Sequence, residues 1–168
     1  MPNRDLIVAE IPRLRRYARA LTGDASRADD LVQDTLERAL SRFSLWRPGN
    51  LRSWLFTIMH NVFVNQIKSA AHLDFLADDL LPDLPLRATQ SDNLELRDLD
   101  RALGRLTAEQ REVLLLVGLE DLSYDEAAKV IGSPIGTVMS RLSRGRERLR
   151  AMLSGVEVPA GAQLKVVK

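Results

Sequence analysis

Two helices that meet at a tight turn are predicted by three residues between positions 124 and 145. Ala128 is small enough to let the helices approach each other, and Gly132 can adopt the positive φ that the turn needs. Val138 can then pack back against the first helix. This spacing predicts a helix-turn-helix, whose second helix starts at Pro134 and runs to about Leu153.

The second helix of this pair combines an apolar stripe with concentrated positive charge. The residues that we expect to be buried are Ile135, Val138, Leu142, Leu149 and Met152. The helix has a single anion, Glu147, and five cations: Arg141, Arg144, Arg146, Arg148 and Arg150. A basic helix end can simply offset the helix dipole. Together with the turn spacing, however, it indicates binding to nucleic-acid phosphates.

The remaining sequence also predicts helices, so we expect an all-α fold with two small domains. Three helices, ending near Gly23, Phe43 and Lys68, form an N-terminal domain at residues 1–68. Residues 69–91, which contain Pro82 and Pro85 and mostly acidic charges, are expected to be a flexible linker. A four-helix domain with the helix-turn-helix follows at residues 92–153, and residues 154–168 are expected to be a disordered tail. Capping boxes are predicted at Thr107–Gln110 and Ser123–Glu126.

The charges are segregated along the chain although their sum is only +1. Residues 1–68 carry +4, residues 69–92 and 93–132 carry −4 each, and residues 133–168 carry +5. The chain has no cysteine and only two histidines, His60 and His72, and no acidic residue stands at ligand spacing from His60. We therefore expect no catalytic site, no metal and no cofactor. Without an apolar run of about 20 residues, we expect no membrane insertion and a cytoplasmic location.

Two further surfaces stand out in the N-terminal domain. The second helix has an acidic face, which suits a basic protein partner and repels DNA: Asp30, Gln33, Asp34 and Glu37. The third helix is rich in aromatic and amide side chains. Such residues can hold and read an unstacked base.

Three segments resemble the extracytoplasmic-function (ECF) group of bacterial sigma factors. Leu122-Ser-Tyr-Asp-Glu-Ala-Ala and Gly132-Ser-Pro-Ile-Gly-Thr-Val-Met-Ser-Arg-Leu-Ser-Arg-Gly-Arg146 are similar to the family's promoter-reading module. Ala28-Asp-Asp-Leu-Val-Gln-Asp34 is similar to its polymerase-binding helix, and Leu51-Arg-Ser-Trp-Leu-Phe-Thr-Ile with Asn61 to its promoter-opening helix. The resemblance covers roughly residues 5 to 153, with the motifs in family order.

The resemblance implies a role for each surface. The acidic face would bind the clamp coiled coil of RNA polymerase core. The polymerase flap is implied as a second element that the protein would contact. The implied downstream-element residues are Trp46, Arg47, Asn50, Arg52, Ser53 and Asn61, whereas Trp54 and Phe56 are expected in the core. The implied upstream-element residues are Ser133, Thr137, Met139, Ser140, Arg141, Ser143, Arg144 and Arg146.

The sequence departs from the family at two places. Met139 stands where members often carry a basic residue, which suggests apolar contact to a thymine methyl. The third helix ends Asn65-Gln-Ile-Lys68 where the family tends towards Asp and consecutive Arg, so a weaker grip on downstream DNA is expected.

The resulting prediction is an alternative sigma factor that directs RNA polymerase to specific promoters in a stress or extracytoplasmic response, under a cognate anti-sigma factor. The main alternative is a sigma mimic that sequesters an anti-sigma factor without touching DNA, although a mimic would not need the arginine-rich helix. A conventional repressor or activator would leave the aromatic, amide-rich helix unexplained. An enzyme is disfavoured by the histidine count.

Overall fold

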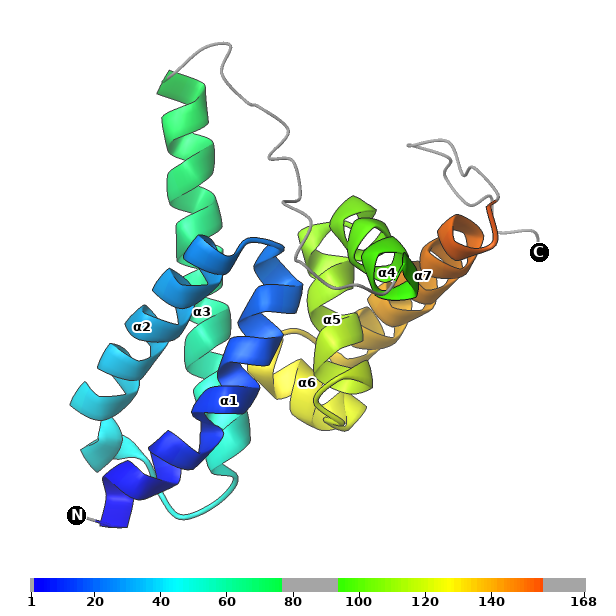
Figure 1. The fold of residues 1–168 in the computed structure, drawn as a ribbon. Helices are drawn as coiled ribbons and strands as arrows, with labels where there is room; N and C mark the ends of the chain where they lie inside the picture. The colour runs from blue at the N-terminus through cyan, green and yellow to red at the C-terminus, as the bar shows by residue number, and fades with distance from the viewer. Residues whose placement is uncertain (1, 77–93, 156–168) are drawn as a thin grey trace.

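The computed structural model describes residues 2–76 and 94–155, and this part of the chain is helical. The elements are α1 (Pro2–Thr22), α2 (Ala25–Ser41), the short 3₁₀ helix η1 (Phe43–Leu45), α3 (Leu51–Leu76), α4 (Leu94–Arg105), α5 (Ala108–Gly118), α6 (Tyr124–Ile131) and α7 (Ile135–Leu153). The predicted all-α class is therefore confirmed. Helices α1 to α3 form one half of the molecule and α4 to α7 the other (Figure 1).

The third helix is longer than the sequence predicts. It continues to Leu76 and projects beyond its neighbours (Figure 1), so residues 69–76 of the predicted linker are helical. This stretch contains no Gly or Pro and includes good helix formers such as Ala70 and Ala71, so it extends the helix without a periodic apolar pattern. The rest of the predicted linker and residues 156–168 of the predicted tail lie outside the described residues.

The helix-turn-helix has the geometry that its residues predict. Gly132 ends α6 in the left-handed conformation with φ of 66°, and Val138 of α7 is completely buried. Gly145 lets α7 lie close to α5, because a β-carbon at that position would come within 3.0 Å of the Leu114 side chain. The turn at Gly132, the buried Val138 and the close approach at Gly145 therefore determine how α7 packs against the other helices of its half.

The two predicted capping boxes differ. At the start of α5, the Thr107 side chain accepts from the Gln110 backbone and the Gln110 side chain reaches back to the Thr107 backbone, so this box is complete. At the start of α6, the Ser123 side chain accepts from the Glu126 backbone. The Glu126 carboxylate, however, bonds to the other half of the molecule.

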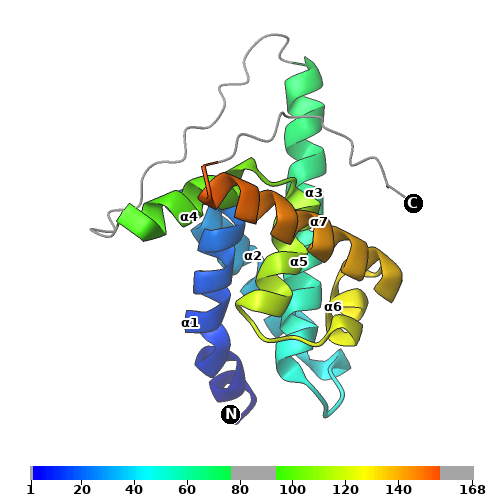
Figure 2. The ribbon, with the colours of Figure 1, turned by 90° about the vertical axis from the view of Figure 1, so that its right-hand side faces the viewer.

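The two halves are packed against each other. Helix α1 contacts α5, and the first part of α3 contacts α6 (Figures 1 and 2). Buried residues of both halves form one hydrophobic cluster, which runs from Ile7 in α1 to Leu142 in α7. Arg111 of α5 donates to the Leu103 carbonyl of α4 at 2.7 Å, within its own half, and to the Leu21 carbonyl of α1 at 2.8 Å. The second of these bonds ties the two halves together.

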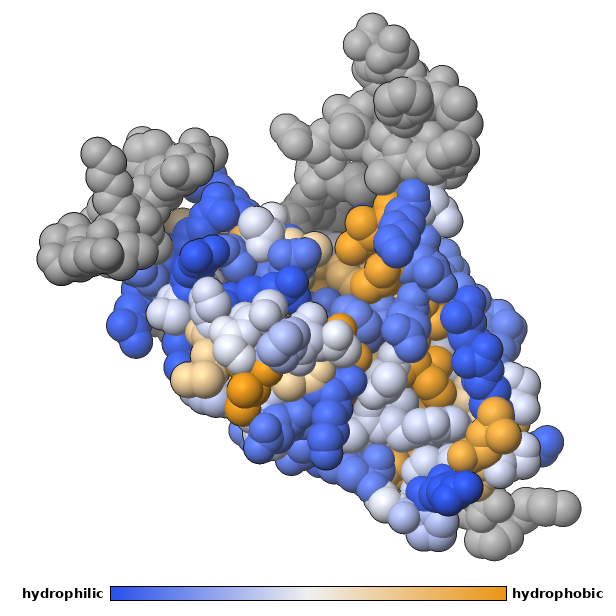
Figure 3. Space-filling model, turned by 180° about the vertical axis from the view of Figure 1, so that it is seen from behind, coloured by the Kyte–Doolittle hydropathy of each residue, from blue (hydrophilic) through white to orange (hydrophobic). Residues whose placement is uncertain are grey.

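The face of the molecule seen from behind is mostly hydrophilic (Figure 3). Figure 3 shows hydrophobic residues only in small separate groups on the face seen from behind. Ile135, which was expected in the buried stripe of α7, is 42% exposed; it is the first residue of the helix. Leu40 of α2 is also exposed, at 49%. Within the described residues, no helix is both long and apolar enough to span a bilayer.

Candidate nucleic-acid and partner interfaces

The acidic face of α2 is open to solvent. Asp30, Gln33, Asp34 and Glu37 are all exposed, while Ala28, Leu31 and Val32 on the opposite side are buried. Asp34, in the middle of this face, accepts a 3.3 Å hydrogen bond from Gln66 of α3. At helical spacing, Leu40 lies two turns beyond Gln33 on this same face, so an exposed apolar side chain stands among the acidic ones.

An aromatic cluster shapes the turn between η1 and α3. The ring centroid of Trp46 lies 5.3 Å from that of Phe43 and 6.5 Å from that of Trp54. These separations are typical of favourable aromatic pairs. Trp46 is half-buried in the cluster, Trp54 packs against the core, and Phe56 is fully buried, as expected for the latter two. The cluster packs the chain that follows η1 against the first turn of α3.

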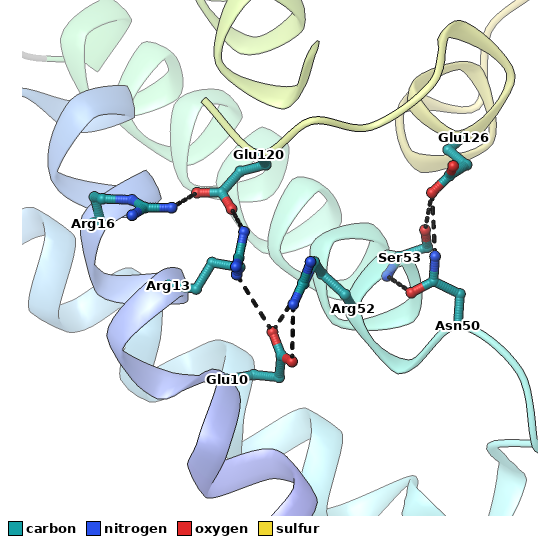
Figure 4. Close-up of polar contacts among 8 residues, drawn as sticks. All are labelled: Glu10, Arg13, Arg16, Asn50, Arg52, Ser53, Glu120 and Glu126. Atoms are coloured by element: carbon teal, nitrogen blue, oxygen red, sulfur yellow. Dashed lines mark hydrogen bonds and ion pairs between the residues drawn. The ribbon is translucent and has the colours of Figure 1, made fainter. Parts of the chain in front are cut away.

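Three of the predicted downstream-element residues sit together at the start of α3. The Asn50 side chain accepts from the Ser53 backbone at 3.2 Å and so caps the helix. Its amide nitrogen and the Ser53 hydroxyl both donate to Glu126 of α6, while Arg52 donates to Glu10 of α1 (Figure 4). All three side chains therefore have partners within the chain.

The other predicted downstream-element residues are spread more widely. Arg47 is exposed in the loop before α3. Asn61 is exposed too, but it lies about two turns beyond Ser53 along α3. A DNA strand that contacted all of these residues would have to run along α3, because the residues do not line one compact pocket.

The predicted upstream-element residues lie along the outer face of α7. Ser140, Ser143, Arg144 and Arg146 are exposed, and the two arginines lie on either side of the serines at 100° per residue. Ser133 and Thr137 are partly exposed, and Arg141 forms an ion pair with Glu109 of α5 at 3.6 Å. Met139 is 51% exposed and stands one turn from the exposed Ile135, which gives the face an apolar edge.

The sequence analysis missed the polar contacts between the two halves. Glu120, in the loop between α5 and α6, is 1% exposed and accepts from Arg13 and Arg16 of α1 (Figure 4). Glu112 of α5, also buried, bonds to His60 of α3. Pairs more than 50 positions apart have no local sequence signal. In the described part of the chain, no group of three His, Cys, Asp or Glu residues could hold a metal ion.

Tyr17 of α1 lies close to these buried carboxylates. Its ring packs edge-on against Phe56, with centroids 4.9 Å apart. Burial raises the pKa of the Tyr17 hydroxyl well above its ordinary value, and the charges of Glu112 and Glu120 raise it further. The neutral phenol is therefore favoured in the packed molecule.

We expect Tyr17 to make the fold less stable at alkaline pH. The unfolded chain loses the Tyr17 proton near pH 10, whereas the folded chain keeps it to higher pH. Over this interval the unfolded state binds fewer protons, so the free energy of unfolding falls by up to about 1.4 kcal/mol per pH unit. Tyr17→Phe keeps the ring and removes this titration. Urea unfolding across a pH series should give the variant a shallower decline, and equal slopes would contradict the assignment.

Comparison with known proteins gives a consistent family for both halves. Residues 7–60 match the family model "Sigma2 domain of PhyR", and residues 96–149 match "Sigma-70, region 4". The chain is 41% identical to the ECF RNA polymerase sigma factor EcfG of Rhodopseudomonas palustris, over 89% of this chain and 84% of that protein. It is 34% identical to the ECF RNA polymerase sigma factor SigL of Mycobacterium tuberculosis, over 86% of this chain and 85% of that protein.

A solved structure agrees with the sequence relatives. The sigma factor RpoE of Bartonella quintana, crystallised in complex with the anti-sigma factor NepR, matches with a TM-score of 0.81 and 35% identity. The match covers 90% of this chain and 96% of that one. The similarity thus extends through both helical halves and the order in which they occur. The chain belongs to the ECF family of RNA polymerase sigma factors.

Proposed function

We propose that this protein is an alternative sigma factor that brings RNA polymerase core to specific promoters and starts transcription there. The observation that carries the proposal is the presence, in one chain, of a sigma region 2-like half and a region 4-like half, each with an exposed surface suited to its partner. The polymerase would catalyse RNA synthesis, so the protein itself would have no catalytic site. Its place of action would be the cytoplasm, where polymerase and promoter DNA are found.

The acidic face of α2 would bind the polymerase clamp. Asp30, Gln33, Asp34 and Glu37 supply negative charge for a basic partner, and DNA would be repelled from this side. The exposed Leu40 adds apolar area within the same face. In protein interfaces a few central residues that lose contact with water on binding contribute most of the binding energy, and Leu40 is placed to be one of them.

The outer face of α7 would read the upstream promoter element in the major groove. Ser140, Ser143 and Arg144 can reach base edges, while Thr137, Arg141 and Arg146 can hold phosphates. The apolar edge formed by Ile135 and Met139 suits thymine methyl groups, which replaces the polar contact expected of a basic residue at position 139.

The start of α3 and the loop before it would hold the unpaired downstream strand. Trp46, Arg47, Asn50, Arg52, Ser53 and Asn61 offer the stacking surface, the cations and the hydrogen-bonding groups that this task requires. A cognate anti-sigma factor would control access to these surfaces, as the complex of the Bartonella quintana relative with NepR suggests.

Transcription in vitro tests the proposal directly. Core polymerase, genomic fragments of the source organism and this protein should give transcripts that core polymerase alone does not make. If the protein instead binds an anti-sigma factor but yields no transcript from any fragment, the sigma mimic is the correct reading. If it associates with neither polymerase nor an anti-sigma factor, both hypotheses, sigma factor and sigma mimic, are wrong.

A further inference from the structure

One of the proposed DNA-binding arginines already has an acidic partner within its own half of the protein. The Arg141 guanidinium of α7 lies 3.6 Å from the Glu109 carboxylate of α5. The Arg141 side chain is 29% exposed and the Glu109 side chain 69%, so the acidic member of the pair is largely in solvent. The charge of Arg141 is therefore balanced before any DNA is bound.

The packing of α7 on α5 brings these two side chains together. The helices are in contact (Figure 2), and at Gly145 they are close, since a β-carbon there would lie 3.4 Å from the Gln110 β-carbon. Glu109 precedes Gln110 in α5, and Arg141 stands one turn before Gly145 on the same side of α7. The capping box of Thr107 and Gln110 fixes the first turn of α5, which contains Glu109. The pair therefore follows from how the two backbones are packed.

The other proposed phosphate-binding arginine of α7 is not held in this way. Arg146 is exposed, and it forms no ion pair within the residues that the structure describes. Glu147, the one acidic residue of α7, is also exposed and is likewise unpaired in this part of the chain. Arg146 can thus bind a DNA phosphate without leaving a protein partner, whereas Arg141 cannot.

This difference determines which DNA Arg141 can bind. An arginine that neutralises a phosphate releases a counterion, and this gain does not depend on the base sequence. Arg141 has to leave Glu109 first, and the freed carboxylate would then lie close to phosphates of the same charge. On DNA of arbitrary sequence few base contacts of α7 are made that could offset this cost. On a matching sequence these base contacts are available.

We propose that Glu109 is a specificity-determining residue: it keeps Arg141 from binding phosphates on DNA of arbitrary sequence and releases it where the base contacts of α7 are made. The inference rests on the proposed function and deepens it, because it separates an arginine that binds any duplex from one that binds a matching duplex. A genome offers a very large number of competing non-specific sites, so specificity depends on the ratio of the two affinities. Loss of Glu109 should lower this ratio.

The test measures how the binding of duplex DNA depends on salt. The probe is a pool of fluorescent duplexes of random sequence, titrated with the full chain over a salt series and followed by anisotropy. We expect Glu109→Gln to bind the pool about threefold more tightly at low salt and to steepen the slope of log affinity against log salt by about 0.9, as for one added phosphate contact. Arg141→Gln should leave the wild-type slope unchanged, while Arg146→Gln, the matched control, should flatten it by about 0.9.

Three further measurements separate the pair from net charge. Glu147→Gln removes the acidic residue of α7 itself and should leave the slope on the random pool unchanged. Glu109→Gln should also have no effect on the slope in a chain that carries Arg141→Gln, because the cation that it would release is gone. On duplexes selected from the pool for tight binding to the wild type, Arg141→Gln should flatten the slope by about 0.9.

The opposite results would overturn the inference. Equal steepening by Glu109→Gln and Glu147→Gln would reflect net charge alone, and a flatter slope for Arg141→Gln on the random pool would show that Glu109 does not restrain Arg141. An unchanged slope for Arg141→Gln on the selected duplexes would show that Arg141 is never released. If Arg146→Gln changes the slope and Glu109→Gln does not, only the inference fails. If the wild type does not bind the pool, or Arg146→Gln has no effect, the proposed DNA-reading role of α7 fails with it.

Discussion

Reversing two charges on α2 should abolish the association of this sigma factor with RNA polymerase core. Asp30→Lys with Glu37→Lys places two cations on a face that we propose meets a basic partner. Like charges across an interface cost several kcal/mol, so we expect the affinity for core polymerase to fall by about 100-fold or more. Both residues are exposed, so the fold should be retained. Fluorescence anisotropy of the labelled protein titrated with core polymerase would measure the loss.

A matched variant separates this contact from net charge. Asp98→Lys with Asp125→Lys makes the same change at exposed positions of the second half, and we expect it to keep most of the affinity for core polymerase. Equal losses in the two variants would place the polymerase contact outside α2. Leu40→Ala offers a second check, because removing an exposed leucine leaves the charge unchanged but should weaken binding if the apolar contact is used.

Local sequence patterns predicted the helices and the turn because those features depend on a few neighbouring residues. Gly132 adopts the positive φ that the turn requires, and Thr107 with Gln110 forms a complete capping box. The end of α3 was misjudged, since helix propensity alone extends a helix where no periodic apolar stripe is needed. Such an end depends on the absence of a stop signal rather than on a pattern.

Long-range pairing was beyond the reach of the same reasoning. Glu126 fits a capping box by sequence, but its carboxylate bonds to Asn50, 76 positions away. Glu120 looks like an exposed loop residue until Arg13 is placed beside it by the packing of α1 on α5. The exposed faces of α2 and α7, by contrast, follow from helical periodicity, so these surfaces could be predicted from the sequence. The contact of Glu126 with the start of α3 could not be predicted in this way.

Removing two arginines from α7 should cost most of the affinity for promoter DNA. Arg144→Ala with Arg146→Ala deletes one proposed base contact and one proposed phosphate contact on either side of the exposed serines. We expect about 100-fold weaker binding to a promoter fragment at low salt. A bidentate contact to a base is worth about 1–3 kcal/mol, and the loss of the phosphate contact weakens binding further. The slope of log affinity against log salt should also fall, by about 0.9 for each lost phosphate contact.

Association with polymerase should survive this change, because the acidic face of α2 is untouched. Arg15→Ala with Arg19→Ala is the matched control: it removes two exposed cations from α1 and should leave the upstream affinity and the salt slope close to those of the wild type. Electrophoretic mobility shift over a salt series and polymerase titration measure the two partners separately. Loss of both activities in the α7 variant would mean a damaged fold, which circular dichroism would detect. Loss of neither would remove α7 as the reader of the upstream element.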